Sequence, residues 1–225
     1  MNYAYLCEGI NLIEEEMEEG IDWSAIVSAV TTAAVAIWTA WFTYNQKTKD
    51  KMTDLKIEQY KKDMKKKSFK RSEDTARVLG ALNKILLGAN ADRVYIVQPH
   101  PLGHIAFLSI QFEVKANGVQ GMRYEVQKLE MSDVAKFCER LVDNLWLYFN
   151  NIDEQVQDPY AKALLSSNGT QVAAIKRMTT ARDWVGSIFC EFIDVPTISE
   201  ADLQKLMHEA AVQIQYNLPE FQEEE

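Results

Sequence analysis

The sequence predicts an α+β protein in which a transmembrane helix and a basic helical stalk precede a domain with an antiparallel sheet flanked by helices. Three observations support this fold class. Residues 23–46 contain no Asp, Glu, Lys, Arg or His. Residues 47–71 contain eleven basic and four acidic residues but no Gly or Pro, as in an exposed helix. From residue 72 onward, helical and strand-like hydrophobic patterns follow one another, which is typical of a folded α+β domain.

The uncharged segment 23–46 has the length and the flanks of a membrane span. At a rise of ~1.5 Å per residue its helix would extend roughly 36 Å, and the hydrocarbon core of a bilayer is about 30 Å thick. Aromatic residues mark both ends, as at membrane interfaces. The predicted interface residues are Trp23, Trp38, Trp41 and Tyr44. Most other side chains are Ala, Ser or Thr, so insertion is only weakly favoured, and a helix buried in a protein assembly is the alternative interpretation.

Small residues recur at every fourth position of this segment. They are Ser24, Ser28, Thr32, Ala36 and Ala40. Small residues at that spacing allow helix backbones to approach closely in lipid, where packing and hydroxyl hydrogen bonds drive association. The pattern therefore predicts helix–helix packing and a homo-oligomer, although an Ala-, Ser- and Thr-rich helix can also produce such a stripe by composition alone.

Charge is distributed unevenly along the chain. An acidic tail, residues 1–22, carries −7, the stalk at 47–71 carries +7, and the whole chain carries −9. Because positive charge after a span favours the cytoplasmic side, we expect the N-terminus outside and the C-terminal domain in the cytoplasm. Lys47, Lys49 and Lys51 follow the span directly and are expected to contact anionic lipid headgroups. The acidic total argues against nucleic acid as a partner.

The remaining chain predicts a domain at 72–216 followed by an acidic tail at 217–225. Helical spacing of apolar residues and capping residues predict its helices, and β-branched and aromatic runs predict its strands. The expected helices are 76–88, 132–149, 158–166 and 199–216; the expected strands are 93–98, 104–115, 171–178 and 184–194, with turns at 99–103 and 180–183.

Three stretches of this domain carry a family resemblance: ANADRVYI at 89–96, LLSSNG at 164–169 and WVGSIFCEF at 184–192. In that order they resemble the first strand, the helix and turn before the penultimate strand, and a later strand with a packing glycine, in GAF-type domains. The resemblance covers about 72–216 and implies a small-ligand-binding or signalling module. The best-fitting relatives are GAF-like domains behind a single span in phage and bacterial membrane proteins. The turn after the first strand departs from the family's aromatic-His-Asn-Gly pattern, because Pro99 and Pro101 flank His100.

The candidate ligand pocket of this domain is formed by Tyr95, His100 and Phe112. We predict no enzyme activity, cofactor or metal, because no nucleophile–base pair or glycine-rich phosphate loop occurs. His100 and His104 have metal-binding spacing only on a helix, which the neighbouring prolines disfavour, so a metal-dependent enzyme is a third and weaker interpretation. The three cysteines, Cys7, Cys138 and Cys190, suggest reduced thiols.

These features together predict a membrane-anchored, non-enzymatic sensing or interaction protein with a cytoplasmic GAF-like domain. One specific version is a phage holin-like lysis protein that oligomerises through its span. The alternative, from a different class, is a structural component of a phage particle whose Ala-rich helix is buried in protein. Expected partners are lipid, further copies of the chain, and an unidentified protein or small ligand.

Overall fold

The computed structural model describes residues 23–101, 106–180, 183–219 and 221. The chain divides into two compact units, Met1–Lys65 and Lys66–Glu225. The acidic tail at 1–22 and His104 lie outside the described residues, so the structure says nothing about the predictions made for them. The long helix α2, Trp23–Ala89, begins with the uncharged segment, continues through the basic stalk and ends in the second unit.

In the first unit, α2 exposes its uncharged segment. The helix is long and apolar enough to cross a membrane by length and composition, and none of the side chains in its most apolar window is buried. Its threonine hydroxyl groups donate within the helix: Thr32 Oγ1 donates to Ser28 O at 2.7 Å and Thr39 Oγ1 to Val35 O at 2.9 Å. A polar group in an apolar environment must find its partner within the protein, and these hydroxyl groups do so without water.

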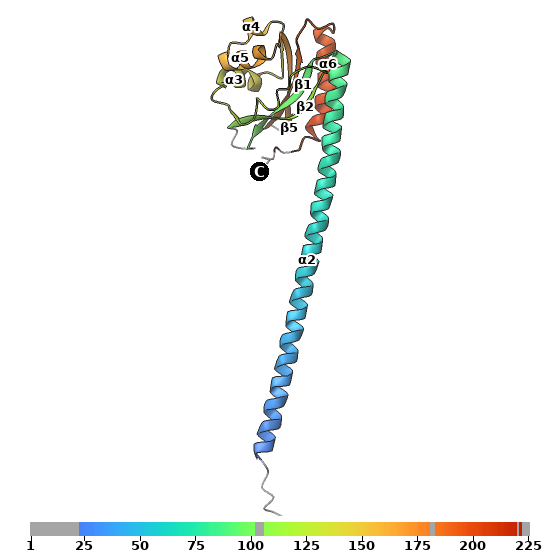
Figure 1. Ribbon diagram of the computed structural model, residues 1–225, viewed down its shortest axis with the longest axis vertical. Helices are drawn as coiled ribbons and strands as arrows, with labels where there is room; N and C mark the ends of the chain where they lie inside the picture. The colour runs from blue at the N-terminus through green and yellow to red at the C-terminus, as the bar shows by residue number, and fades with distance from the viewer. Residues whose placement is uncertain (1–22, 102–105, 181–182, 220, 222–225) are drawn as a thin grey trace, which may run out of the picture. The chain divides into compact units, whose positions relative to one another are not determined.

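The second unit is built on a six-stranded antiparallel sheet with the order β3-β2-β1-β6-β5-β4 (Figure 1). The strands are β1 Arg93–His100, β2 Phe107–Lys115, β3 Leu129–Glu130, β4 Trp146–Phe149, β5 Val172–Thr180 and β6 Asp183–Phe192. The helices after α2 are α3 Ala135–Asp143, α4 Ile152–Gln155, α5 Pro159–Ser167 and α6 Glu200–Gln215. Helices combined with an antiparallel sheet confirm the predicted α+β class.

Each face of the sheet packs against its own set of helices. The last turns of α2 and the whole of α6 cover one face, and their core residues include Leu82, Ile85 and Met207. Helices α3, α4 and α5 cover the other face, where Phe137 and Leu165 pack on the sheet (Figure 1). Burial of alternate strand residues on opposite faces produces these two separate cores.

Side-chain caps fix the starts of α5 and α6, as Asn151 does for α4. Asp158 accepts hydrogen bonds from the backbone N–H groups of Tyr160 and Ala161, with Pro159 at the first helical position of α5. Ser199 accepts from the backbone N–H of Asp202 at the start of α6, in agreement with the predicted cap. Both helices therefore begin where the sequence indicates.

The predicted helix at 132–149 was wrong in its second half. The helix α3 ends at Asp143, and residues 146–149 form strand β4, which pairs with β5 from Trp146↔Lys176 to Phe149↔Ala173. Asn144 ends the helix in an extended conformation, and the aromatic run that follows suits a strand. The tertiary pairing with β5 thus overrides a helical spacing that continues to Leu145.

The predicted turn at 99–103 was also misplaced at its start. Strand β1 continues through Pro99 to His100, and both side chains are buried. Pairing of β1 with β6 stops at Val97, so the missing N–H of Pro99 breaks no ladder on that side. The proline therefore stands at a strand end that has a single neighbour, β2.

Candidate functional site

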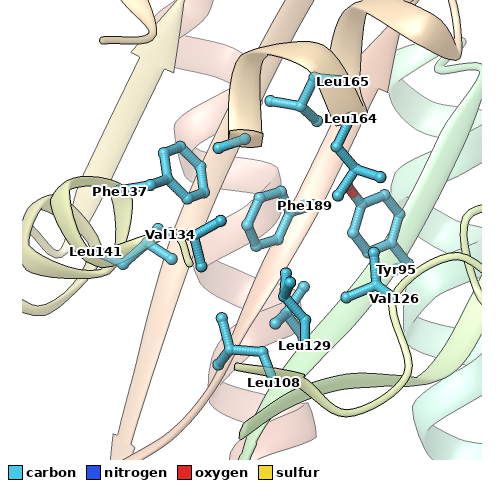
Figure 2. Close-up of a pocket in the computed structure, with 12 residues that line it drawn as sticks. Tyr95, Leu108, Val126, Leu129, Val134, Phe137, Leu141, Leu164, Leu165 and Phe189 are labelled. Carbon is cyan, nitrogen blue, oxygen red and sulfur yellow. The ribbon is translucent and has the colours of Figure 1, made fainter. Parts of the chain in front are cut away.

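An apolar cavity lies between the sheet and the helices α3 and α5. It is lined by Tyr95, Val97, Leu108, Val126, Leu129, Val134, Phe137, Leu141, Ala161, Leu164, Leu165 and Phe189 (Figure 2). The floor comes from β1, β2 and β6, and the loop 122–134 supplies further walls. Tyr95 stacks on Phe189 with 5.1 Å between ring centroids, so two aromatic rings form part of the floor.

The cavity has a volume of about 40 Å³. A water molecule needs at least ~10–15 Å³ and two to four polar partners, and a dry cavity of about 150 Å³ can hold benzene. The lining offers one polar atom, the Tyr95 hydroxyl, so the site disfavours water. Its volume is below that of the benzene-binding cavity, and the observed conformation can therefore admit only a small apolar species.

A buried polar network adjoins the cavity through Tyr95. The Tyr95 hydroxyl donates a hydrogen bond to Glu191 Oε1, and the Arg93 guanidinium pairs with Glu191 Oε2 at 2.8 Å. Thr170 Oγ1 donates to Glu191 Oε2 at 2.9 Å. Burial and the neighbouring Glu191 carboxylate hold the pKa of Tyr95 well above its usual value. Tyr95 is therefore a neutral donor whose proton is already committed to Glu191.

The same network fixes the loop that closes the cavity. Arg93 also donates to the carbonyl oxygens of Gln120 at 3.1 Å and Asn168 at 3.0 Å. Glu113 accepts from the backbone N–H groups of Met122 at 2.6 Å and Arg123 at 3.2 Å. These contacts tie the loop after β2 and the turn before β5 to the sheet.

A glycine permits the approach of Glu113 to this loop. A Cβ atom at Gly121 would lie 2.7 Å from Glu113 Oε2. Real Cβ contacts are essentially never that short, so a side chain here would displace the carboxylate that accepts from the Met122 and Arg123 N–H groups.

The structure does not bring the three predicted pocket residues together. Tyr95 lines the cavity, but Phe112 packs in the opposite core, with α2 and α6. The reason is a β-bulge: Ile96 pairs with Phe112 while Val97 pairs with Ile110, which leaves Gln111 as an extra residue and reverses the alternation along β2. His100 is also buried outside the cavity, with its Nε2 2.8 Å from Ser109 Oγ.

Sequence reasoning missed Arg93 and Glu191. Both are charged residues within apolar strand sequences, and both are almost completely buried, at 1% and 0% exposure. A charge in such a run is a signal that could have identified them, because a buried charge requires a partner. The partners are 98 positions apart, so their pairing depended on the order of the strands.

The residues predicted for the membrane segment are described on α2. The small-residue positions Ser24, Ser28, Thr32, Ala36 and Ala40 are exposed, as are Trp38, Trp41, Tyr44, Lys47, Lys49 and Lys51. Trp38 stacks on Phe42 with 5.8 Å between ring centroids. The side chain of Trp23 lies outside the described ones.

The described part of the chain contains no recognisable metal site, and its two cysteines are weakly reactive. The described residues contain no group of three or more His, Cys, Asp or Glu arranged to hold a metal ion. Burial, with a smaller effect of Asp158, raises the pKa of the Cys138 thiol to about 11, and burial raises that of Cys190 still further. Both cysteines are therefore protonated and weakly reactive near neutral pH.

Comparison with solved structures identifies the fold of the second unit. The GAF3 domain of Slr1393 from Synechocystis sp. PCC6803 aligns with a TM-score of 0.51 at 12% identity, over 61% of this chain and 88% of that one. The PixJ GAF domain of Thermosynechococcus elongatus aligns with a TM-score of 0.53 at 12% identity, over 65% of this chain and 88% of that one. A far-red cyanobacteriochrome photoreceptor aligns with a TM-score of 0.53 at 11% identity, over 72% of this chain and 95% of that one. No protein-family model and no curated protein sequence matches. The chain thus contains a GAF-like fold.

Proposed function

We propose that this protein is a membrane-anchored, non-enzymatic sensing or interaction protein with a cytoplasmic GAF-like unit. The observation that carries the proposal is the uncharged segment of α2, in whose most apolar window no side chain is buried by the rest of the chain. Apolar helical surface of this extent is stable only when lipid or protein covers it. The basic residues that follow it favour lipid and a cytoplasmic C-terminal unit.

The orientation can be tested with the natural cysteines. Cys7 precedes the span, while Cys138 and Cys190 are buried in the second unit. A free cysteine has a pKa near 8.5, but burial holds that of Cys138 at about 11, so Cys138 forms far less of the reactive thiolate at neutral pH. A membrane-impermeant maleimide added to intact cells should label the protein, and Cys7→Ser should remove the labelling.

Permeabilised cells provide the control for this experiment, since every cysteine outside a folded core is then accessible. Labelling of Cys7 only after permeabilisation would contradict the proposed orientation. A matched Cys190→Ser variant should label as strongly as the wild-type chain, because Cys190 is fully buried.

Self-association through the small-residue face of α2 is a further part of the proposal. Exposed Ser28 and Thr32 occupy that face and leave room for a second backbone. Ser28→Leu/Thr32→Leu should reduce cross-linked dimers and higher oligomers in the membrane. The matched variant Thr31→Leu/Val35→Leu changes the same helix at neighbouring positions and should leave them unchanged. An unchanged ladder in the first variant would argue against this interface.

The apolar cavity is the proposed sensing element of the GAF-like unit. Its lining selects a small apolar ligand, because no charged side chain faces it and the Tyr95 proton is directed to Glu191. A larger ligand requires the loop 122–134 to move, and this motion would alter the hydrogen bonds of Glu113. A ligand that binds the open and closed forms with different affinity would shift the population between them.

In its most specific form, the proposal describes a phage holin-like lysis protein. The supporting feature is the small-residue face, because association of many such helices can open a membrane. Induced expression in bacterial cells should then cause abrupt loss of membrane potential, and the Ser28→Leu/Thr32→Leu variant should delay it. Membrane insertion without any change in potential would exclude the holin form and leave the sensing role intact.

The exposed apolar segment of α2 also supports a second candidate function, in which the protein is a structural component of a phage particle. In that case neighbouring proteins would cover the same apolar side chains of α2. Recovery of the chain in detergent-free particles would support the structural role over the membrane role.

A further inference from the structure

The chain after α6 lies against the end of β1. Four half-buried residues of this segment form what we call the strap: Asn217, Leu218, Pro219 and Phe221. Asn217 Oδ1 accepts a hydrogen bond from Arg77 at 3.2 Å, and the Phe221 ring stacks on His100 with 4.1 Å between centroids. Leu218 packs on the core that α2 and α6 share. The strap therefore covers a defined surface of the second unit.

A glutamine of β1 also faces the strap. Pairing of β1 with β6 ends at Val97, so Gln98 follows the last paired residue. Its side chain is 4% exposed, and its Nε2 donates a hydrogen bond to the carbonyl oxygen of Pro219 at 3.2 Å. We call Arg77, Gln98 and His100 the strap seat, because each of them contacts a strap residue.

The strap satisfies only half of the Gln98 amide. The Gln98 Oε1 atom is buried and has no hydrogen-bond partner in the described part of the chain. Turning the amide over would not pair this oxygen, because it would then face the Pro219 carbonyl, which is also an acceptor. Buried polar atoms are nearly always paired in folded proteins, since an unpaired acceptor is destabilising. The Gln98 Oε1 atom therefore marks a place for an N–H group.

Proline at position 219 explains why the strap does not supply that group. In an antiparallel pair, one residue exchanges both its N–H and its C=O with the same partner, so both groups of an extended residue point to one side. A glutamine amide presents one donor and one acceptor, and it can pair with both groups. Pro219 provides the C=O but has no N–H. A different residue at this place would pair with both polar atoms of Gln98.

We propose that the strap seat binds an extended peptide of a partner protein, and that the strap occupies the seat as a weaker, built-in competitor. The partner peptide has an apolar residue at the place of Leu218, a residue other than proline at the place of Pro219, and an aromatic ring at the place of Phe221. Its additional N–H completes the pairing with Gln98 and lets it displace the strap. A second copy of this chain does not fit this description, because its strap carries the same proline.

Binding of a labelled peptide to the full-length chain in detergent micelles tests the proposal. Leu218→Ala/Phe221→Ala removes both apolar anchors and gives a chain with a released strap. The amide probe is a synthetic peptide with the sequence of residues 215–221 and Pro219→Ala, and the ester probe replaces the N–H of that alanine by an ester oxygen. We expect the amide probe to bind the released chain about three- to tenfold more tightly than the ester probe, because the ester lacks one hydrogen bond.

Two further variants show whether this difference arises at the seat. Gln98→Met in the released chain should make the two probes bind equally, since the acceptor is gone. Val212→Ala/Tyr216→Ala is the matched control for strap release, because both side chains are exposed and lie outside the strap. That control and the wild-type chain should bind the amide probe about tenfold more weakly than the released chain, because the tethered strap competes. Equal affinity of the two probes for the released chain, or no binding, would overturn the proposal.

A second measurement keeps both anchors of the strap in place. Pro219→Ala supplies the missing N–H, but it also makes the released strap more flexible. The rate at which carboxypeptidase removes Phe221 should fall about three- to tenfold more when Pro219→Ala is made in the wild-type chain than when it is made in Gln98→Met, because the flexibility cancels in this comparison. An equal effect in both chains would contradict the proposed pairing.

Both measurements are independent of the proposed function. They require neither membrane insertion nor a ligand in the apolar cavity, so their failure would leave the membrane-anchored sensing role intact. Conversely, a chain that does not insert into membranes would still show the difference between the amide and ester probes.

Discussion

Val35→Arg should release the protein from membranes into the alkaline carbonate supernatant. Val35 lies near the middle of the uncharged segment and is 62% exposed on α2. Arginine at the centre of a span costs about 2.5–3.5 kcal/mol, and valine contributes about −0.3 to −0.6 kcal/mol. The insertion equilibrium should therefore change by roughly two to three orders of magnitude. Because the segment is rich in Ala, Ser and Thr, its insertion free energy is only weakly favourable and cannot offset that change.

Ile57→Arg is the matched control for this variant. It replaces a β-branched side chain by arginine on the same helix, in the charged stalk, where Ile57 is already 47% exposed. We expect this variant to stay in the membrane pellet. If the two variants fractionate alike, the site of the charge is irrelevant and the segment is not a span.

Arg93→Met should strongly destabilise the GAF-like unit. The substitution removes the cation from a pair whose members are almost completely buried and leaves the Glu191 carboxylate without its charge partner. Hydrogen bonds to Gln120, Asn168 and Thr170 are lost with it. Removing one partner of a buried pair costs about 3–5 kcal/mol, which is a large part of the usual 5–15 kcal/mol of domain stability. Pulse proteolysis in urea measures the loss.

The exposed pair of Lys84 and Glu209 provides the comparison. Its side chains are 63% and 52% exposed and their charged atoms lie 3.6 Å apart. Lys84→Met removes the same charge with the same substitution and should cost about 0–1 kcal/mol. Equal effects of the two substitutions would show that the Arg93 network does not hold the sheet and the loops together.

The same network predicts a partial rescue. Arg93→Met/Glu191→Leu replaces both buried charges by apolar groups, which is often neutral for isolated pairs. Tyr95 and Thr170 would still lose their acceptor, so we expect the double variant to be more stable than Arg93→Met but less stable than the wild-type chain.

Local patterns predicted most of the fold, and the errors occurred where distant pairing decided the outcome. The helices that start at Asp158 and Ser199 were predicted correctly, because a helix start with its cap depends only on the next three residues. Leu145 and Trp146 continue a helical spacing, yet Trp146 belongs to a strand because β5 pairs with it. No local signal specifies that partner, which comes from a segment about 30 residues later.

The candidate site was less predictable than the fold. Tyr95 was identified because it lies within a strand, where alternation assigns it to one face. Phe112 was assigned to the same pocket, but the extra residue Gln111 places it on the opposite face, and a bulge depends on the register between strands. Arg93 and Glu191 meet only once β1 lies beside β6.

The most direct test of the central claim is alkaline carbonate extraction of the full-length chain expressed in bacterial cells, followed by flotation of the pellet in a density gradient. The account predicts that the protein stays with the membranes and floats with the lipid, because the uncharged segment of α2 is embedded in the bilayer. Recovery of the protein in the carbonate supernatant, or at the bottom of the gradient with protein assemblies, would contradict it.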